Sequence, residues 1–242
     1  MIRRYNQLID TLTQTQRHTA TKSVRKVKIV EVGPRDGLQN EPSKLLTPQQ
    51  KIKFVQKLAE AGCQFIECGS FVSPKWVPAM ANSSEVLSGL TQWRKDLLNE
   101  NIRKTTLTFS VLTPNLKGFN DAISAGGGKV DEIAIFGAAS ETFSMKNLGC
   151  SIEDSLDRFR LVTNAAKEMD IPVRGYVSCV LGCPYEKQVD PSKVAKVAAD
   201  LVEMGCHEVS LGDTIGVGNP YSTVKMINEV KVRMLHSILY CQ

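Results

Sequence analysis

The 242-residue sequence lacks several features that would place a chain in a particular class at once. No apolar run approaches the roughly 20 residues that a membrane-spanning helix needs, so no membrane association is predicted. The seven cysteines show no C-x-x-C pair, which argues against a zinc ribbon and against a disulfide framework, and suits a reducing compartment. There are only three histidines and no His-x-His pair. No Gly-x-Gly-x-x-Gly follows the first predicted strand, which argues against a dinucleotide-binding sheet.

The positive charge is concentrated at the amino terminus. Residues 1–28 contain seven Lys and Arg residues and one acid, Asp10, although the whole chain has a net charge of only +5. Removing them from 30 basic and 25 acidic residues leaves 23 and 24, so the remainder is nearly neutral. Residues 1–27 are therefore predicted to be a mitochondrial transit peptide, which is typically basic, hydroxyl-rich and acid-poor. A disordered basic tail is the alternative. Nucleic-acid binding is not predicted, because no basic patch with interleaved aromatic residues recurs later in the chain.

Short β-branched or apolar runs alternate with amphipathic stretches along the chain. Helix start signals occur at Thr47-Pro48, Asn115, Ser151, Pro191 and Asn219-Pro220. Strands alternating with helices of this length predict a parallel sheet built from βαβ units. The predicted strands are 27–32, 64–68, 107–112, 130–136, 173–179 and 207–211.

The fold class is therefore α/β, and the pattern alone leaves two arrangements open. One is an open, doubly wound sheet. The other is a (β/α)8 barrel of the TIM type, for which six strand–helix units are two short of closure. A length of 242 residues is enough for a single domain of either kind.

Polar residues collect where the predicted strands end, which is where parallel α/β proteins carry their chemistry. Carboxylates and a guanidinium on neighbouring strand ends predict one pocket. An Asp beside neutral oxygens suits Mg²⁺ or Mn²⁺, and Arg35 could stabilise developing negative charge. The alternative for each carboxylate alone is a helix cap or a surface ion pair. The polar residues at strand ends are Arg35, Asp36, Glu67, Ser70, Thr113, Asn115, Ser140, Glu141, Ser178, Asp213 and Thr214.

Two other residue types could carry chemistry. His207 precedes the sixth predicted strand, at the opposite end from this pocket, so a structural role is expected for it. Cys179 and Cys183 flank the end of the fifth strand, where a nucleophile is conceivable, but packing or lining of the loop is the favoured interpretation.

Seven segments between about Lys28 and Tyr221 carry motifs that together resemble the 3-hydroxy-3-methylglutaryl-CoA (HMG-CoA) lyase family. The Arg35-Asp36 motif alone marks only a wider superfamily of metal-dependent barrel enzymes. The segments Ser70–Pro78 and Phe136–Glu141 are much more specific to the lyases. The full set is Gly33–Asn40, Ser70–Pro78, Leu112–Phe119, Phe136–Glu141, Arg174–Cys179, Gly182–Glu186 and Ser210–Gly218.

The resemblance implies a (β/α)8 barrel in the mitochondrial matrix that splits HMG-CoA into acetyl-CoA and acetoacetate. This reaction is the last step of leucine breakdown and of ketone-body formation. By the family pattern Asp36 is a metal ligand for Mg²⁺ or Mn²⁺, and Arg35 steadies the thioester enolate. Glu67 and Asp213 belong to the polar cluster around metal and substrate, and the residues expected to bind substrate are Arg35, Tyr176, Ser178 and Thr214.

The chain departs from the family pattern after Tyr221. The family's His-x-His pair, its later Asn and its Gly-Gly-Cys-Pro-Tyr loop are not found, and residues 231–242 are predicted to be a divergent tail after a partial lyase domain of residues 28–230. We therefore expect a truncated chain with weak or absent metal binding and impaired turnover. The alternative is a non-catalytic product that binds a full-length lyase subunit, and a homodimer is also left open. A related synthase or aldolase is disfavoured by the loop Phe71–Trp76.

Overall fold

The computed structural model describes residues 27–41, 45–99 and 107–240, so all of the predicted leader but Val27, and the last two residues of the predicted tail, lie outside the described residues. Six parallel strands form one sheet whose spatial order follows the chain order. This order excludes a doubly wound sheet, in which the order reverses. The strands are β1 (Val30–Glu31), β2 (Phe65–Ser70), β3 (Thr108–Leu112), β4 (Glu132–Ala138), β5 (Val173–Ser178) and β6 (Glu208–Leu211).

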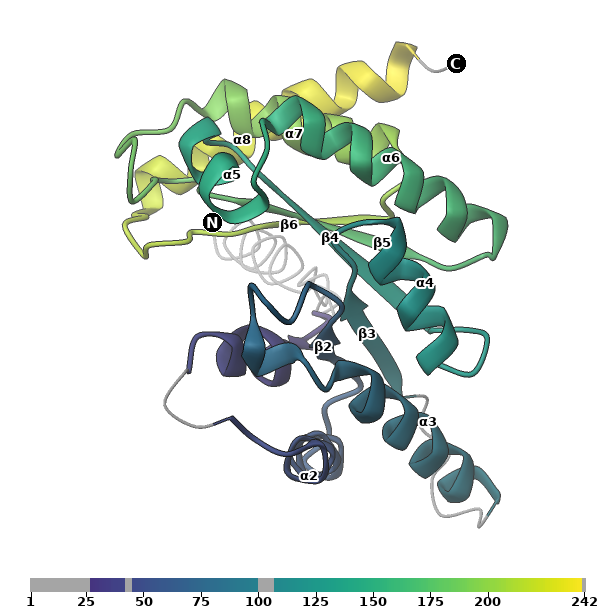
Figure 1. Cartoon of the computed structure of the whole chain (residues 1–242). Helices are drawn as coiled ribbons and strands as arrows, with labels where there is room; N and C mark the ends of the chain where they lie inside the picture. The colour runs from purple at the N-terminus through teal and green to yellow at the C-terminus, as the bar shows by residue number, and fades with distance from the viewer. Residues whose placement is uncertain (1–26, 42–44, 100–106, 241–242) are drawn as a thin grey trace, which may run out of the picture.

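Helices follow the strands and lie along one side of the curved sheet, which gives a half-barrel (Figure 1). The predicted TIM-type α/β architecture, incomplete at six units, is confirmed. No helix among the described residues is long and apolar enough to cross a membrane. The α-helices are α2 (Pro48–Glu60), α3 (Ser83–Asn99), α4 (Leu116–Ala125), α5 (Glu141–Leu148), α6 (Ile152–Glu168), α7 (Pro191–Glu203) and α8 (Pro220–Tyr240), with short η1 (Gly33–Gly37, π-helical) and η2 (Pro78–Met80, 3₁₀).

The apolar core fills the space between the sheet and the helices. Its largest fully buried members include Ile66 and Phe109 on strands and Leu90, Phe159 and Leu201 on helices. Because side chains alternate along a strand, the residues between these core positions point to the concave side of the sheet. That side is the interior of the half-barrel, and it carries the polar residues discussed below.

The predicted start signals act as helix caps. The Thr47 hydroxyl accepts the Gln50 N–H at 3.3 Å, while the Gln50 side chain accepts the Thr47 N–H at 2.9 Å. This reciprocal pair satisfies two donors that a helix start otherwise leaves open. Asn115 and Ser151 accept backbone N–H groups in the same manner. Local sequence therefore sets where three of these helices begin.

Two details differ from the sequence prediction. The first strand is much shorter than 27–32, because it starts only at Val30, after the exposed Val27 and Ile29, and ends before Val32, where the chain turns into η1. Helix α5 was not predicted; Ser140 caps it and Gly149, at φ +68°, ends it after only eight residues. Helix α8 runs on through residue 230, where the divergent tail is predicted to begin.

A network of charges joins the amino ends of three neighbouring strands. Arg174 and Glu132 are both nearly buried, and the Arg174 Nη2 lies 2.9 Å from the Glu132 Oε1. Arg174 also pairs with Glu208, which in turn accepts Lys28 at 2.8 Å. Burial opposes the charged form of Arg174, but the two carboxylates outweigh it and raise its pKa. His207 contacts the Val173 carbonyl at 2.8 Å in this network, which agrees with the structural role expected for it.

Replacing Arg174 with Met should destabilise the chain by about 3–5 kcal/mol, because Glu132 is left buried without its counter-ion. Lys196→Met is the matched control, since Lys196 is exposed in its i,i+4 pair with Asp200, and it should cost about 0.5 kcal/mol or less. Urea unfolding measures both changes. Equal effects of the two substitutions would contradict the role given to the buried pair.

The same network predicts a loss of stability in acid. Burial raises the pKa of Glu208, but the Lys28 ammonium and the Arg174 guanidinium lower it more, so the net pKa lies below the usual 4.5. A depressed carboxyl pKa stabilises the folded state above the unfolded pKa, and this contribution disappears as the pH falls through the folded value. Thermal melts between pH 7 and pH 3 should show a smaller acid-induced drop for Glu208→Gln than for the unchanged chain. An identical drop in both proteins would refute this assignment.

Candidate active site at the carboxyl ends of the strands

The turn after β1 is the first element of the site. The Glu31 carboxylate accepts the Gly33 N–H at 2.6 Å, and it lies so close that a Cβ on residue 33 would meet it at 2.7 Å. The Val32 carbonyl accepts the N–H groups of Arg35 and Asp36 at 3.1 and 2.7 Å. Pro34 occupies the first turn, where its missing N–H costs nothing. The turn therefore presents Arg35 and Asp36 as neighbours at the carboxyl end of the strand.

Arg35 is anchored by a buried carboxylate on the next strand. Its Nε lies 2.7 Å and its Nη2 3.4 Å from the two oxygens of Glu67, which is 0% exposed on β2. This two-point contact fixes the plane of the guanidinium. Burial opposes the charged form of Arg35, but Glu67 and then Asp36 outweigh it and raise its pKa. The guanidinium is therefore held as a permanent cation on the concave side.

Tyr176 of β5, three strands away from β2 in the sheet, completes the cluster. Its hydroxyl donates to Glu67 Oε2 at 2.5 Å, and its ring centroid lies 5.4 Å from the Arg35 Cζ. Burial and the Glu67 charge raise the pKa of Tyr176, so the phenol stays protonated at neutral pH. We call Arg35, Glu67 and Tyr176 the interior cluster. It unites three of the residues that the sequence placed in one pocket.

Asp36 has a different environment from the interior cluster. Its side chain is 55% exposed, and one of its oxygens accepts Arg35 Nη1 at 2.8 Å. Among the described residues, no three His, Cys, Asp or Glu side chains are grouped so that they could hold a metal ion. Both oxygens of Glu67 already accept hydrogen bonds from Arg35 or Tyr176, so this carboxylate is committed to the cation and the phenol. The donor set of the described residues therefore does not fit a tightly bound Mg²⁺, which requires near-octahedral oxygen coordination.

Asp213 and Thr214 shape the loop after β6. The Asp213 carboxylate accepts the N–H groups of Val217 and Gly218 at 3.2 and 2.7 Å, and the Thr214 hydroxyl accepts the Cys179 N–H at 2.8 Å. No hydrogen bond or ion pair of the described residues connects them to the interior cluster. Their observed contacts are those of loop-ordering residues, at the same end of the sheet as the cluster.

Ser178 and the two nearby cysteines lie at the end of β5. Ser178 pairs in register with Ala138 and is half-buried. Burial raises the pKa of the Cys179 thiol to about 12. The Cys183 sulfur accepts the N–H groups of Tyr185 and Glu186 at 3.3 and 3.4 Å, so it caps its own tight turn. Both thiols are buried, which supports the packing role expected for them.

Two buried polar atoms in the described residues have no hydrogen-bond partner, Gln39 Oε1 and Ser70 Oγ. Gln39 lies two residues after η1, and Ser70 is the last residue of β2, so both belong to the end of the sheet that carries Arg35. Sequence reasoning placed Ser70 among the strand-end polar groups and gave Gln39 no role of its own. Only the finished packing shows that neither atom has a partner.

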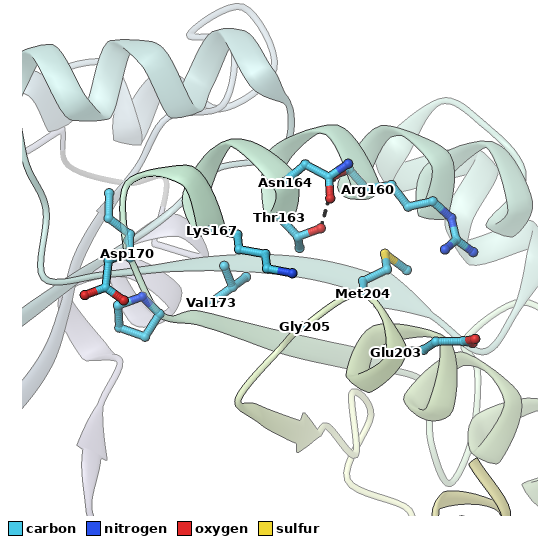
Figure 2. A pocket seen from close by; sticks show the side chains of 11 residues that line it. Arg160, Thr163, Asn164, Lys167, Asp170, Val173, Glu203, Met204 and Gly205 are labelled. Atoms are coloured by element: carbon cyan, nitrogen blue, oxygen red, sulfur yellow. Dashed lines mark hydrogen bonds between the residues drawn. The ribbon is translucent and has the colours of Figure 1, made fainter. Parts of the chain in front are cut away.

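The measurable hollows of the surface lie elsewhere. One cavity, with a volume of 780 Å³, lies between α6 and the connection from α7 to β6 (Figure 2). Arg160 and Lys167 line one wall, and Glu203 lines the other. A second hollow of 800 Å³ extends past Lys28 and His207 at the amino ends of the strands. Neither is lined by a member of the interior cluster, so the candidate site is the open concave face.

The structure predicts that the two neighbouring carboxylates of this site differ in their effect on stability. Glu67→Gln should destabilise the chain by about 3–5 kcal/mol, because Arg35 then lacks its buried counter-ion. Asp36→Asn should cost about 1 kcal/mol or less, since the Asp36 side chain is itself exposed to solvent and Arg35 keeps Glu67. Chemical denaturation of both variants measures the difference. A small effect of Glu67→Gln would show that the buried pair does not support the fold.

Comparison with known proteins adds a family context to this geometry. A family model described as HMGL-like matches residues 26–240. The chain is 52% identical over 214 residues to the mitochondrial hydroxymethylglutaryl-CoA lyase of Rattus norvegicus, and the match covers 88% of this chain and 60% of that protein. A lyase of Pseudomonas aeruginosa named for 3-hydroxy-3-isohexenylglutaryl-CoA and hydroxymethylglutaryl-CoA is 52% identical over 206 residues, covering 85% and 64%.

Solved structures give the same result. The crystal structure of hydroxymethylglutaryl-CoA lyase from Pseudomonas aeruginosa superimposes with a TM-score of 0.76, covering 86% of this chain and 64% of that one. An HMG-CoA lyase from Acinetobacter baumannii, solved with coenzyme A and 3-methylmalate, matches at 30% identity with a TM-score of 0.73 and covers 84% and 61%. The chain thus spans slightly under two thirds of the length of these relatives.

Proposed function

Because the chain belongs to the HMGL-like family, we propose that its concave face binds HMG-CoA and that its chemistry is the cleavage of this thioester into acetyl-CoA and acetoacetate. The observation that carries this proposal is the interior cluster, in which a buried carboxylate and a phenol hold one guanidinium at the carboxyl ends of the strands. The family places its reaction at this end of the barrel.

The cleavage requires charge stabilisation at one oxygen. The tertiary hydroxyl loses its proton, the C2–C3 bond breaks, and its electron pair forms the enolate of acetyl-CoA, which is then protonated at C2. Arg35 uses three of its N–H groups on Glu67 and Asp36 and has two more to donate. We assign these free donors to the thioester oxygen, where negative charge develops. Glu67 positions Arg35, and Tyr176 orients Glu67.

Other predicted site residues are kept as part of the proposal. Ser178, Asp213 and Thr214 are assigned to the substrate-facing loops after β5 and β6, supported by their place at the same end of the sheet. Asp36 is assigned to a divalent metal, Mg²⁺ or Mn²⁺, which this chain alone would hold only weakly. Among the described residues, no group of three His, Cys, Asp or Glu side chains could hold the ion with Asp36.

A second candidate function is binding without turnover, in partnership with a full-length lyase subunit. The supporting observation is the edge of the sheet at β6, whose four residues are all partly exposed, next to exposed Val217 and Tyr221. An unpaired strand edge is a template for pairing with another chain. A homodimer would use the same surface.

We also propose that the protein is located in the mitochondrial matrix, where leucine breakdown and ketone-body formation would use this reaction. The basic leader supports this location. Relatives named as mitochondrial and as cytoplasmic match with similar identity, so the composition of residues 1–27 carries the assignment. A fusion of these residues to a fluorescent reporter should enter mitochondria, and a diffuse cytosolic signal would contradict it.

Turnover of the purified chain distinguishes the two candidate functions. Acetoacetate release from (S)-HMG-CoA with Mg²⁺ should be lower than for the Pseudomonas aeruginosa lyase by roughly 100-fold or more, because the charge-stabilising groups are incomplete. Calorimetric titration with Mn²⁺ should show only weak binding. Turnover near that of the relative would refute the impaired-enzyme proposal, and size-exclusion chromatography with the relative tests pairing.

A further inference from the structure

Ser70 has a hydroxyl that the fold buries and does not satisfy. The residue is 1% exposed, its Oγ has no partner, and its backbone N–H donates to Ser83 at 3.0 Å. An unsatisfied buried polar group costs about 1–3 kcal/mol. Ser83, thirteen residues later, shows the usual arrangement, since its hydroxyl also donates to the Met80 carbonyl at 2.8 Å. No contact among the described residues offsets the free-energy cost of burying the Ser70 hydroxyl without a partner.

The register of the sheet determines where the Ser70 side chain points. Ser70 pairs with Leu112, and register partners in a parallel sheet point to the same face. A Cβ on the preceding Gly69 would meet Ser83 of α3, so residue 69 faces the helices and residue 70 faces the concave side. The register shift between Glu67 and Gly69 inserts one residue, which brings Glu67 to this same concave face.

Ser70 thus lies beside the interior cluster. Glu67 holds Arg35 and precedes Ser70 by three residues, which is about 10 Å along a strand. A five-carbon acyl group with a hydrogen bond at each end covers a comparable length. The second unsatisfied atom, Gln39 Oε1, belongs to the turn that carries Arg35, so both such atoms of the described residues lie at this end. Two unrelated packing defects would not be expected to fall together beside one cationic cluster.

From this arrangement we infer that Ser70 is a specificity residue whose hydroxyl donates to the free carboxylate of the substrate's acyl group, while Arg35 takes the thioester end. Ser70 needs an acceptor for its hydroxyl, and the nearby carboxylates Glu67 and Asp36 are already paired with Arg35. The acceptor that remains is the free carboxylate of the substrate's acyl group. This inference rests on the proposed function and adds the residue that selects a dicarboxylic acyl group.

Calorimetric binding of two thioesters to two variants tests the role of Ser70, and this measurement does not require turnover. HMG-CoA carries the free carboxylate, whereas 3-hydroxy-3-methylbutanoyl-CoA keeps the hydroxyl and has a methyl in place of the carboxylate-bearing arm. Ser70→Ala should weaken calorimetric binding of HMG-CoA about 10- to 100-fold and leave the monoacid ester unchanged, because hydrogen bonds to charged groups are worth about 1.5–3 kcal/mol. Ser83→Ala, the matched control, should leave the preference between the two esters as it is.

Thermal melts without ligand complete the test. Ser70→Ala should melt at the same temperature as the unchanged chain or higher, since it removes an unsatisfied hydroxyl, whereas Ser83→Ala should melt lower, since it leaves the Ser70 N–H unpaired. A lower melting temperature for Ser70→Ala, or equal weakening of both esters, would overturn the inference while leaving the proposed function intact. An unchanged chain that binds neither ester would overturn the proposed function and this inference with it.

Discussion

The contact between Arg35 and Glu67 is the constraint on which the rest of the site depends. Glu67 is fully buried, and a carboxylate without solvent must have a cation and hydrogen-bond donors close by. Arg35 supplies two N–H groups and Tyr176 supplies a hydroxyl, so one anion fixes two side chains from strands that are not neighbours. The same pair joins the turn after β1 to the sheet, although β1 itself has only two residues. Site geometry and local stability therefore have one physical source.

The two ends of the sheet use buried charge differently. At the amino ends, Arg174 is matched by Glu132 and Glu208, and Lys28 and His207 surround them, so the network is self-contained. At the carboxyl ends, Arg35 keeps free donors, and Ser70 and Gln39 keep atoms without partners. Barrel enzymes place stability at the amino face and chemistry at the carboxyl face. The distribution of satisfied and unsatisfied groups in this chain follows that division.

Membership of a family does not by itself give a chain the side chains that bind a metal ion. Membership follows from a match over residues 26–240, but a metal site depends on donors that meet in space. In the described residues Asp36 stands without a second free carboxylate, since Glu67 and Asp213 are both engaged by N–H or O–H donors. The described residues thus contain the hydrogen-bonded cluster around Arg35, and they do not contain a group of three side chains that could hold a metal ion.

The sequence by itself determined the architecture and predicted which strand-end residues to expect in the site. Alternating strand and helix patterns predicted six units, and the caps at Thr47, Asn115 and Ser151 set helix starts, because both depend on neighbours within a few residues. The motif at Arg35 likewise predicted a site at the first strand end. Tertiary structure alone decided that Glu67 pairs with Arg35, that Tyr176 reaches it from 109 residues further along the chain, and that Asp213 caps its own loop. It also left the Ser70 hydroxyl unsatisfied. Such outcomes depend on strand register and burial, which place distant residues together and which no local pattern encodes.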